Sequence, residues 1–346
     1  MTERYPHVKA LSSNRSTRHF RWTIVVVSLT GMLVLSALLS LFIGERSFGL
    51  LDVIDIIRGV APETSREIFT VQRLPRMILA FAAGGGLSLA GVILQGIYRN
   101  PLVSPYTLGV SGGAALGATI IMALGLHHVI GSMILPLAGF SGSILAIAFI
   151  YILSFRGGKT HIQSMLLVGV MFSFIASSSM MFLKTLATKD SLHTIVFWMM
   201  GSLDESDMSM IYLVLAVATA VLLVSMVFAG PLNALRLGQE KAGHLGINTE
   251  LTIRILFVLA SLLIGVTVSV AGVIGFVGLV VPHIIRVMVG SDYRILLVTS
   301  FMGGGIFLLL SDIAARVMIL PIGVITGIVG GTVFIFVLTR RNMKTL

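Results

Sequence analysis

The chain has 346 residues, of which 56% are apolar and only 11% are charged, and its mean hydropathy is +1.02. Soluble domains average roughly 45–50% apolar and about 25% charged residues, and a globule of this size has too little interior to hide so much apolar surface. This composition excludes a soluble domain, a disordered chain and a coiled coil, and it excludes a nucleic-acid binder despite the formal net charge of +10. It predicts an all-α membrane protein.

Nine stretches are apolar and long enough to cross a bilayer core of about 30 Å as helices, which takes roughly 20 residues each. In chain order they are Trp22–Ile43, Pro75–Tyr98, Thr107–Leu126, Ile130–Phe155, Ile162–Leu186, Met208–Gly230, Leu251–Met288, Ile295–Val317 and Pro321–Leu338. The seventh would be about 57 Å long as a single helix, so we expect two passes with a tight turn near Ala271 and Gly272. The sequence therefore predicts a polytopic protein with ten transmembrane helices.

The distribution of cations predicts the orientation, because cytoplasmic segments of membrane proteins are enriched in Lys and Arg. With both termini inside, the inner segments hold sixteen Lys and Arg against four acids, whereas the outer segments hold eight against ten. We expect residues 1–21 to form a basic cytoplasmic tail, residues 22–340 a single transmembrane domain and residues 341–346 a second cytoplasmic tail. The first apolar stretch is longer than a signal-peptide core and lacks a clear cleavage site, so we expect a retained anchor.

Two outer segments stand out. Residues 44–74 repeat Phe48, Leu51 and Ile54 at helical spacing, which favours an amphipathic helix at the membrane interface. Residues 187–207 are predicted to be a loop that carries three acids close to its end.

The inner segment 231–247 is too polar to span the membrane, yet it is rich in helix-forming residues. Two Leu-Gly pairs predict a short helix that ends in glycine turns. A solvated loop seldom exposes several leucines, so we predict a docking surface for a cytoplasmic partner. Its candidate residues are Leu235, Leu237, Gly238, Ala242, Leu245 and Gly246.

Two features of the apolar stretches bear on packing. Glycine recurs at every fourth position at Gly109, Gly113 and Gly117 and again at Gly323, Gly327 and Gly331. This spacing lets helices approach closely, within the bundle, at a subunit interface or along a translocation path. Pro282 interrupts the eighth predicted helix, which we expect to be irregular and turned away from lipid.

Ionisable side chains are nearly absent from the membrane segments, whereas ion-coupled transporters and proton pumps keep some inside the bundle. Asp312 is the exception, and Arg316, four residues later, predicts a local ion pair. We find no spacing typical of a metal site. Gly158-Lys159-Thr160 resembles the end of a phosphate-binding loop, but the position of its first glycine is Leu153, within an apolar helix. We expect no catalytic residue, metal or cofactor, so a partner must supply the energy for transport.

Several short motifs are distributed along the chain. They are Arg73-Leu-Pro-Arg76, Gln95, Arg99-Asn-Pro-Leu102, Leu108-Gly-Val-Ser111 with Gly113-Ala114, Phe197-Trp-Met-Met-Gly-Ser-Leu203, Gly275-Phe-Val-Gly-Leu-Val-Val-Pro-His283 with Arg286, Asp312 with Arg316, and Leu320-Pro-Ile-Gly323. Together they resemble the FecCD family of ABC-importer permeases, which serve iron–siderophore complexes, haem and vitamin B12. The resemblance covers residues 70–338 and implies the fold of a type II ABC importer permease, with ten helices and both ends cytoplasmic.

The resemblance also implies partners. Two permease chains, identical or related, would line one path across a bacterial or archaeal cytoplasmic membrane. Two cytoplasmic ATPase subunits would bind segment 231–247, and a periplasmic or lipid-anchored binding protein would deliver the chelate. The family's arginines that pair with glutamates of the binding protein match Arg73, Arg76 and Arg316. Snorkelling arginines at the interface are the alternative. The family's inner gate maps to His161, Ile162 and Gln163.

Two departures from the family concern the predicted outer surface. The segment between Arg316 and Pro321 lacks the acid of the usual Glu-Leu-Pro, and Gly330-Gly331-Thr332 replaces the usual Gly-Ala-Pro. The predicted cargo is an iron–siderophore complex, because such complexes are the most frequent cargo of the family. Haem, cobalamin and molybdate or tungstate are the alternatives. An ion-coupled secondary transporter, which would need Asp312, is the alternative from another class.

Overall fold

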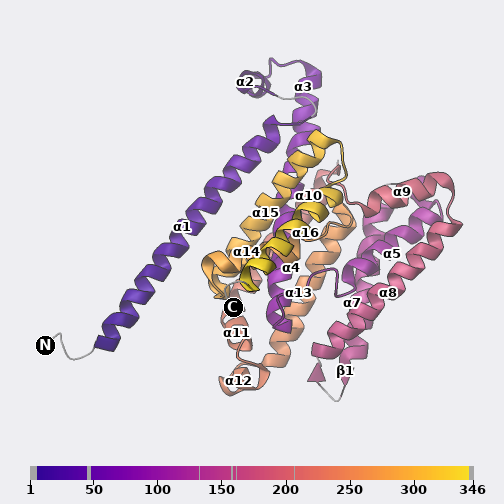
Figure 1. Cartoon of the computed structure of the whole chain (residues 1–346). Helices are drawn as coiled ribbons and strands as arrows, with labels where there is room; N and C mark the ends of the chain where they lie inside the picture. The colour runs from indigo at the N-terminus through magenta and orange to yellow at the C-terminus, as the bar shows by residue number, and fades with distance from the viewer. Residues whose placement is uncertain are drawn as a thin grey trace.

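The structure, a computed structural model, describes residues 6–44, 48–131, 133–156, 159–160, 162–205 and 207–342, and it is almost entirely helical (Figure 1). The first half contains α1 (Pro6–Phe42), α2 (Leu50–Arg58), α3 (Glu63–Glu67), the π-helix η1 (Ile68–Arg73), α4 (Leu74–Tyr98), α5 (Val110–Ala123), α6 (Leu126–Ile130), α7 (Ile134–Ser154) and α8 (Ile162–Leu186). The second half contains α9 (Lys189–Met199), α10 (Met208–Val227), α11 (Ala229–Leu235), α12 (Gln239–His244), α13 (Thr249–Ala271), α14 (Val277–Val289), α15 (Tyr293–Met318) and α16 (Ile322–Asn342). Two short strands, β1 (Phe155–Arg156) and β2 (Lys159–Thr160), pair in antiparallel orientation.

Each of the ten predicted membrane segments contains a helix. Among the described residues, seven helices are long and apolar enough to cross a membrane, and α5, α14 and the apolar part of α16 are shorter. The predicted turn in the long seventh stretch is confirmed, because α13 ends at Ala271 and Gly272 follows with φ of 67°. The prediction of an all-α polytopic fold is correct.

The interface helix predicted within residues 44–74 is present as α2. The segment 187–207, predicted to be a loop, instead contains the eleven-residue helix α9. Thr188 caps this helix, since its side chain accepts a hydrogen bond from the backbone N–H of Ser191.

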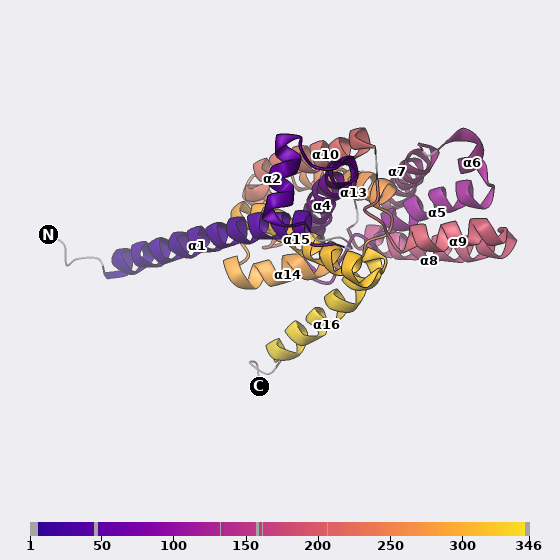
Figure 2. The ribbon, with the colours of Figure 1, turned by 90° about the horizontal axis from the view of Figure 1, so that it is seen from above.

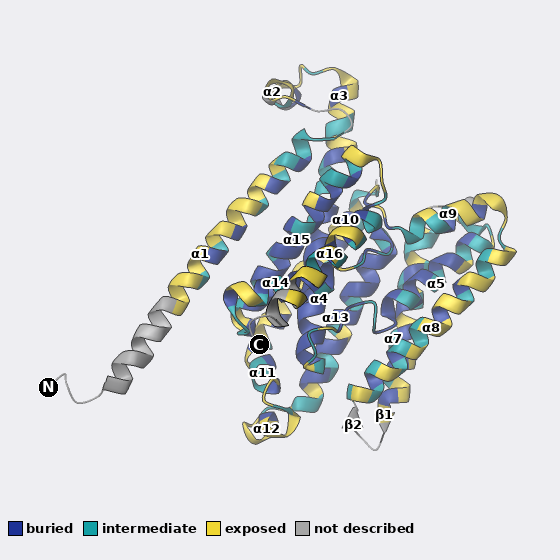
Figure 3. Cartoon of the chain, viewed as in Figure 1, coloured by how far each residue is buried: buried dark blue, intermediate teal, exposed yellow. Residues whose placement is uncertain are grey.

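Helix α4 forms the centre of the bundle and packs against α15, α13, α10 and α14. Most of its residues are buried, whereas α8 and the part of α1 from Arg18 onward expose many apolar side chains (Figure 3). Viewed from above, α5, α7, α8 and α9 form a second group beside this centre, and α1 and α16 extend away from it (Figure 2). The exposed apolar faces are those that a bilayer would cover.

Close helix crossings depend on glycine, as the sequence predicts. A Cβ on Gly84 would collide with the carbonyl oxygen of Gly304, and one on Gly304 would collide with that of Gly84, so α4 and α15 touch backbone to backbone. Gly113 crosses Gly142 of α7 in the same way. Gly327 differs, because a Cβ there would meet no atom of this chain within 4 Å.

Helix α14 has only thirteen residues and follows a non-helical segment, so the predicted irregularity is confirmed. Its position corrects one prediction: the helix continues through Pro282 and the break precedes Val277. Proline has no N–H to donate to the carbonyl of Gly278, four residues earlier. The side chain of Gln95 replaces that donor, with Nε2 3.4 Å from the Gly278 oxygen, and Arg286 Nη2 donates to Gln95 Oε1 at 3.1 Å.

The bundle has two ends, which we name after the short helices found there. At the α12 end, Trp22 Nε1 of α1 donates to the carbonyl of Val289, where α14 finishes, at 3.0 Å. At the α2 end, Arg316 Nη2 of α15 donates to the carbonyl of Ser40, near the end of α1, at 3.0 Å. In Figure 1 the start of α1, the strand β1 and α12 lie at the lower end, and α2 and α3 lie at the upper end. Helices α1 and α15 therefore run in the same direction, and α14 runs opposite to them.

Candidate functional site

At the α2 end, five charged residues gather into one group that we call the arginine cluster: Arg73, Arg76, Asp204, Asp312 and Arg316. Asp312 lies at its centre and is completely buried. Arg76 Nε is 2.6 Å from Asp312 Oδ1, and Arg316 Nε is 3.0 Å from Asp312 Oδ2. The predicted local pair is confirmed, and it is part of a larger network, because Arg76 also forms an ion pair with Asp204.

The start of α4 places two of the arginines. The π-helical turn η1 directly precedes Leu74 and Pro75, and the proline nitrogen carries no hydrogen for a helical bond. Arg73 ends this turn with its side chain buried against α1, where Nη1 donates to the carbonyl of Leu41 at 2.5 Å. Its guanidinium also lies 4.4 Å from the ring centroid of Phe48. The Arg-Leu-Pro-Arg motif therefore directs one arginine to α1 and the other to Asp312.

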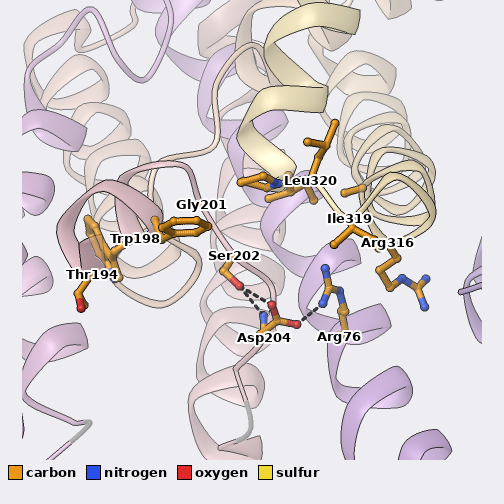
Figure 4. Close-up of a pocket in the computed structure, with 13 residues that line it drawn as sticks. Arg76, Thr194, Trp198, Gly201, Ser202, Asp204, Arg316, Ile319 and Leu320 are labelled. Carbon is orange, nitrogen blue, oxygen red and sulfur yellow. Dashed lines mark hydrogen bonds and ion pairs between the residues drawn. The ribbon is translucent and has the colours of Figure 1, made fainter. Parts of the chain in front are cut away.

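The motif that begins at Phe197 places Asp204. Gly201, with φ of 73°, turns the chain out of α9, and Ser202 N–H donates to the carbonyl of Ala271 at 3.0 Å. Gly323 N–H in turn donates to the carbonyl of Met200 at 2.9 Å. These backbone bonds hold the segment against the bundle, so that the carboxylate of Asp204 faces Arg76 (Figure 4).

Two cavities of about 480 and 470 Å³ lie on either side of the ion pair between Arg76 and Asp204. The first is lined mainly by apolar side chains of α9 and of the turn between α15 and α16 (Figure 4). The second is lined by η1, by Arg76 of α4 and by Glu205. In the first, Ile319 adopts φ of 54°, a conformation that β-branched residues rarely take, within the segment that lacks the family's acid.

Most side chains of the arginine cluster are shielded from solvent. The side chain of Arg76 is 18% exposed and that of Asp204 is 68% exposed, while Arg73 is buried and Arg316 is nearly so. The structure thus brings the three predicted arginines together. It adds Asp204 as a partner of Arg76 and extends the predicted pair of Asp312 with Arg316 to Arg76. The role of the arginines in docking stays a prediction.

At the opposite end, segment 231–247 folds as two short helices, α11 and α12, rather than one. Gly238 separates them with φ of 112°, and Gly246 follows α12 with φ of 81°. Leu235 and Ala242 are buried and pack the segment against the bundle, whereas Leu237 and Leu245 are 59% and 64% exposed. The six predicted residues therefore divide into an anchoring pair, an exposed pair and two glycine turns.

Helix α11 is tied to the start of α15. Asn233 Nδ2 donates to Asp292 Oδ1 at 2.9 Å, and the backbone N–H of Tyr293 donates to Asn233 Oδ1 at 3.1 Å. Arg236 Nη1 donates to the carbonyl of Ser291 at 2.9 Å. A displacement of the α11–α12 segment would thus act directly on α15, which carries Asp312 and Arg316 at its other end.

The predicted inner gate is described only in part. His161 lies outside the described residues, Ile162 begins α8 and is half-buried, and Gln163 is exposed. Among the residues that the structure describes, no group of three or more His, Asp or Glu side chains is arranged to hold a metal ion.

These features define a multi-span helical membrane protein. A sequence model of the FecCD transport family matches residues 32–340, and the chain belongs to this family. It is 37% identical over 290 residues to a cobalamin import system permease of Halobacterium salinarum, covering 82% of this chain and 77% of that protein. It is 35% identical to a hemin transport system permease of Yersinia pestis, over 78% of this chain and 82% of that protein. The chain is therefore an ABC transporter permease.

Solved structures agree with this assignment. A transporter described as of the metal-chelate ABC type, in an inward-facing conformation, matches with a TM-score of 0.80 and 29% identity, covering 92% of this chain and 99% of that one. A chain of PsaBC from Streptococcus pneumoniae, solved with an antibody fragment, matches with a TM-score of 0.55 at 16% identity, which supports the fold alone.

Proposed function

We propose that this chain forms the transmembrane pathway of a type II ATP-driven importer whose cargo is a metal chelate. The observation that carries the proposal is the match of nearly the whole chain to the metal-chelate type transporter, together with the exposed leucines of the α11–α12 segment. The chain supplies packing, a path and docking surfaces, and ATP hydrolysis belongs to separate subunits.

The names of the relatives favour one cargo chemistry over others. Permeases named for cobalamin and for hemin carry a metal held in a macrocyclic ring, and both are at least 35% identical to this chain. We therefore rank a metal macrocycle above the ferric siderophore predicted from family frequency. Ferric siderophores and molybdate or tungstate are the competing cargoes in the same assay.

The partners follow from the two ends of the bundle. Two cytoplasmic ATPase subunits would bind the α12 end through Leu237 and Leu245, and a binding protein would dock on the α2 end near Arg73, Arg76 and Arg316. A second permease chain, identical or related, would complete the path. The cation count supports a cytoplasmic α12 end, with both termini inside the cell. Alternating access would then begin at α11–α12, pass through α15 and open or close the gate near Ile162.

An ion-coupled transporter is the rival function, and it would need a titratable carboxylate inside the bundle. Asp312 has that position, but its two oxygens are paired with Arg76 and Arg316. This pairing supports a structural role for Asp312 and so favours the importer.

The test is uptake into liposomes that contain this chain with its ATPase and binding protein. Labelled cobalamin, haem, ferric siderophores and molybdate would be offered in parallel, with and without ATP. We expect ATP-dependent accumulation of one chelate, and no accumulation by the permease alone. Accumulation driven by an ion gradient without the ATPase, and lost in Asp312→Asn, would contradict the proposal.

A further inference from the structure

A cavity of about 500 Å³ at the α12 end is not used by the proposed transport mechanism. It lies between the start of α1, the segment that follows α11 and the turn that joins α14 to α15. Arginines from three separate segments line it: Arg18 in α1, Arg236 after α11 and Arg294 in the first turn of α15. Trp22 lines the same cavity, and the guanidinium carbon of Arg18 lies 4.9 Å from its ring centroid.

The charge of this cavity is not balanced from within. In the described part of the chain, none of the three arginines forms an ion pair with a carboxylate. The one acid that lines the cavity is Asp292, and its carboxylate already accepts hydrogen bonds from Asn233 Nδ2 at 2.9 Å and from the backbone N–H of Arg294 at 3.1 Å. The cavity therefore contains three guanidinium groups and one carboxylate, and that carboxylate is already hydrogen-bonded to other groups. This excess of positive charge favours the binding of an anion.

The cavity lies where the protein passes from polar to apolar surface. Trp22 begins the apolar stretch of α1, and its indole N–H donates to the carbonyl of Val289 at the end of α14. Further along the same helices, Ile24 and Val27 of α1 and Val287 of α14 are exposed apolar side chains. Tryptophan is enriched at the depth of lipid headgroups, with apolar residues facing the acyl chains.

We propose that this cavity binds the phosphate group of an anionic phospholipid. Guanidinium groups suit phosphate because they donate pairs of parallel hydrogen bonds to its oxygens. Basic pockets between membrane helices at the bilayer surface are sites for anionic headgroups. The adjoining exposed apolar side chains give the acyl chains a surface to contact, which a free phosphate would not use.

A bound headgroup would add a link between three elements that already contact each other in this region through Trp22, Asn233 and Arg236. It would hold α1 against the segment after α11 and against the start of α15, which is the same region that anchors α11 through Asn233 and Arg236. The lipid would thus stabilise the base of the α11–α12 segment.

The test is native mass spectrometry of the purified full-length chain, with phosphatidylglycerol, phosphatidylcholine or inorganic phosphate added. The pocket variant Arg18→Gln/Arg236→Gln/Arg294→Gln is compared with Arg58→Gln/Arg66→Gln/Lys189→Gln, which removes three exposed cations at the α2 end. We expect wild type and the α2-end variant to retain phosphatidylglycerol in preference to phosphatidylcholine. The pocket variant should bind phosphatidylglycerol roughly 100-fold more weakly, given the contribution of each cation near a membrane surface.

Equal retention of phosphatidylglycerol by wild type and the pocket variant would overturn the proposal. Displacement of the lipid by inorganic phosphate at equal concentration would also overturn it, in favour of a site for soluble phosphate. If the triple variant does not fold, Arg294→Gln alone is measured, with an expected loss of about 5-fold. No loss in a folded single variant would then count against the site.

Discussion

Asp312 is buried among membrane helices because two guanidiniums surround it. An unpaired carboxylate or an unpaired guanidinium in such a place would be strongly destabilised by the loss of water around its charge. Arg316 lies on the same helix, whereas Arg76 comes from α4. The cluster therefore joins α4 to α15 at the α2 end by charge, in addition to the glycine crossing nearer their middle.

The cluster predicts unequal effects for its two acids. Asp312→Asn would leave the guanidiniums of Arg76 and Arg316 without their shared carboxylate in a buried place, and we expect a loss of about 3–5 kcal/mol in the free energy of unfolding. Asp204→Asn removes a largely exposed partner and should cost about 1 kcal/mol or less. Thermal unfolding of the purified protein in detergent measures both. Equal losses would mean that burial does not decide the strength of these pairs.

The same residues predict how a binding protein would respond to charge. If an acidic surface docks on Arg76, Arg76→Gln should slow its association roughly 10-fold at low salt and much less at high salt. Asp204→Asn should speed association, because it removes a competing carboxylate from Arg76. Association rates across a salt series test this, with Arg58→Gln as a control for an exposed cation on the nearby α2. Rates that do not change in either variant would remove Arg76 from the docking surface.

The α11–α12 segment separates its apolar residues by function. Leu235 and Ala242 are buried, so aspartate at either position should unfold the segment, whereas Leu237 and Leu245 are exposed. We expect Leu237→Asp/Leu245→Asp to leave the permease folded and to abolish co-purification of its ATPase. Leu124→Asp/Leu186→Asp is the matched control, since both leucines are equally exposed at the far ends of α5 and α8. If the Leu237→Asp/Leu245→Asp variant retained the ATPase, this surface would be excluded as the docking site of the ATPase.

Periodicity and length were sufficient to predict most elements. Each of the ten predicted membrane segments contains a helix, and Gly272 marked the turn after α13 because glycine readily adopts positive φ. Helix α9 was not predicted, because the acids near the end of residues 187–207 led us to interpret this segment as a loop. The apolar residues Ile195 and Trp198 already had helical spacing. The split of α11 from α12 was missed as well, and Gly238 was its signal.

Pairings between distant residues could not be predicted in this way. The pair of Asp312 with Arg316 is local and was found from its spacing, but Arg76 and Asp312 are 236 positions apart. No local pattern specifies which arginine reaches a buried acid from another helix. Likewise, Gln95 was recognised only as a motif residue, and its role beside Pro282 depends on how α4 packs against α14.

Across the whole molecule, α15 links the two ends as a single helix about 39 Å long. Its first turn contacts α11, and its last turns carry Asp312 and Arg316. Its backbone contact with α4 at Gly304 leaves little freedom for independent sliding. This geometry favours a shift of α4 and α15 as one unit when the α12 end is displaced.

The orientation of the whole chain is open to a direct test, because the sequence contains no cysteine. Any introduced thiol is then unique, and Glu63→Cys at the α2 end and Glu240→Cys at the α12 end are both at exposed positions. The excess of cations at the α12 end predicts that this end is cytoplasmic. A membrane-impermeant maleimide should therefore label Glu63→Cys in intact cells and Glu240→Cys only after permeabilisation. Ser88→Cys, at a fully buried position, should stay unlabelled in both conditions. The reverse pattern would place the arginine cluster inside the cell, where no extracytoplasmic binding protein could reach it.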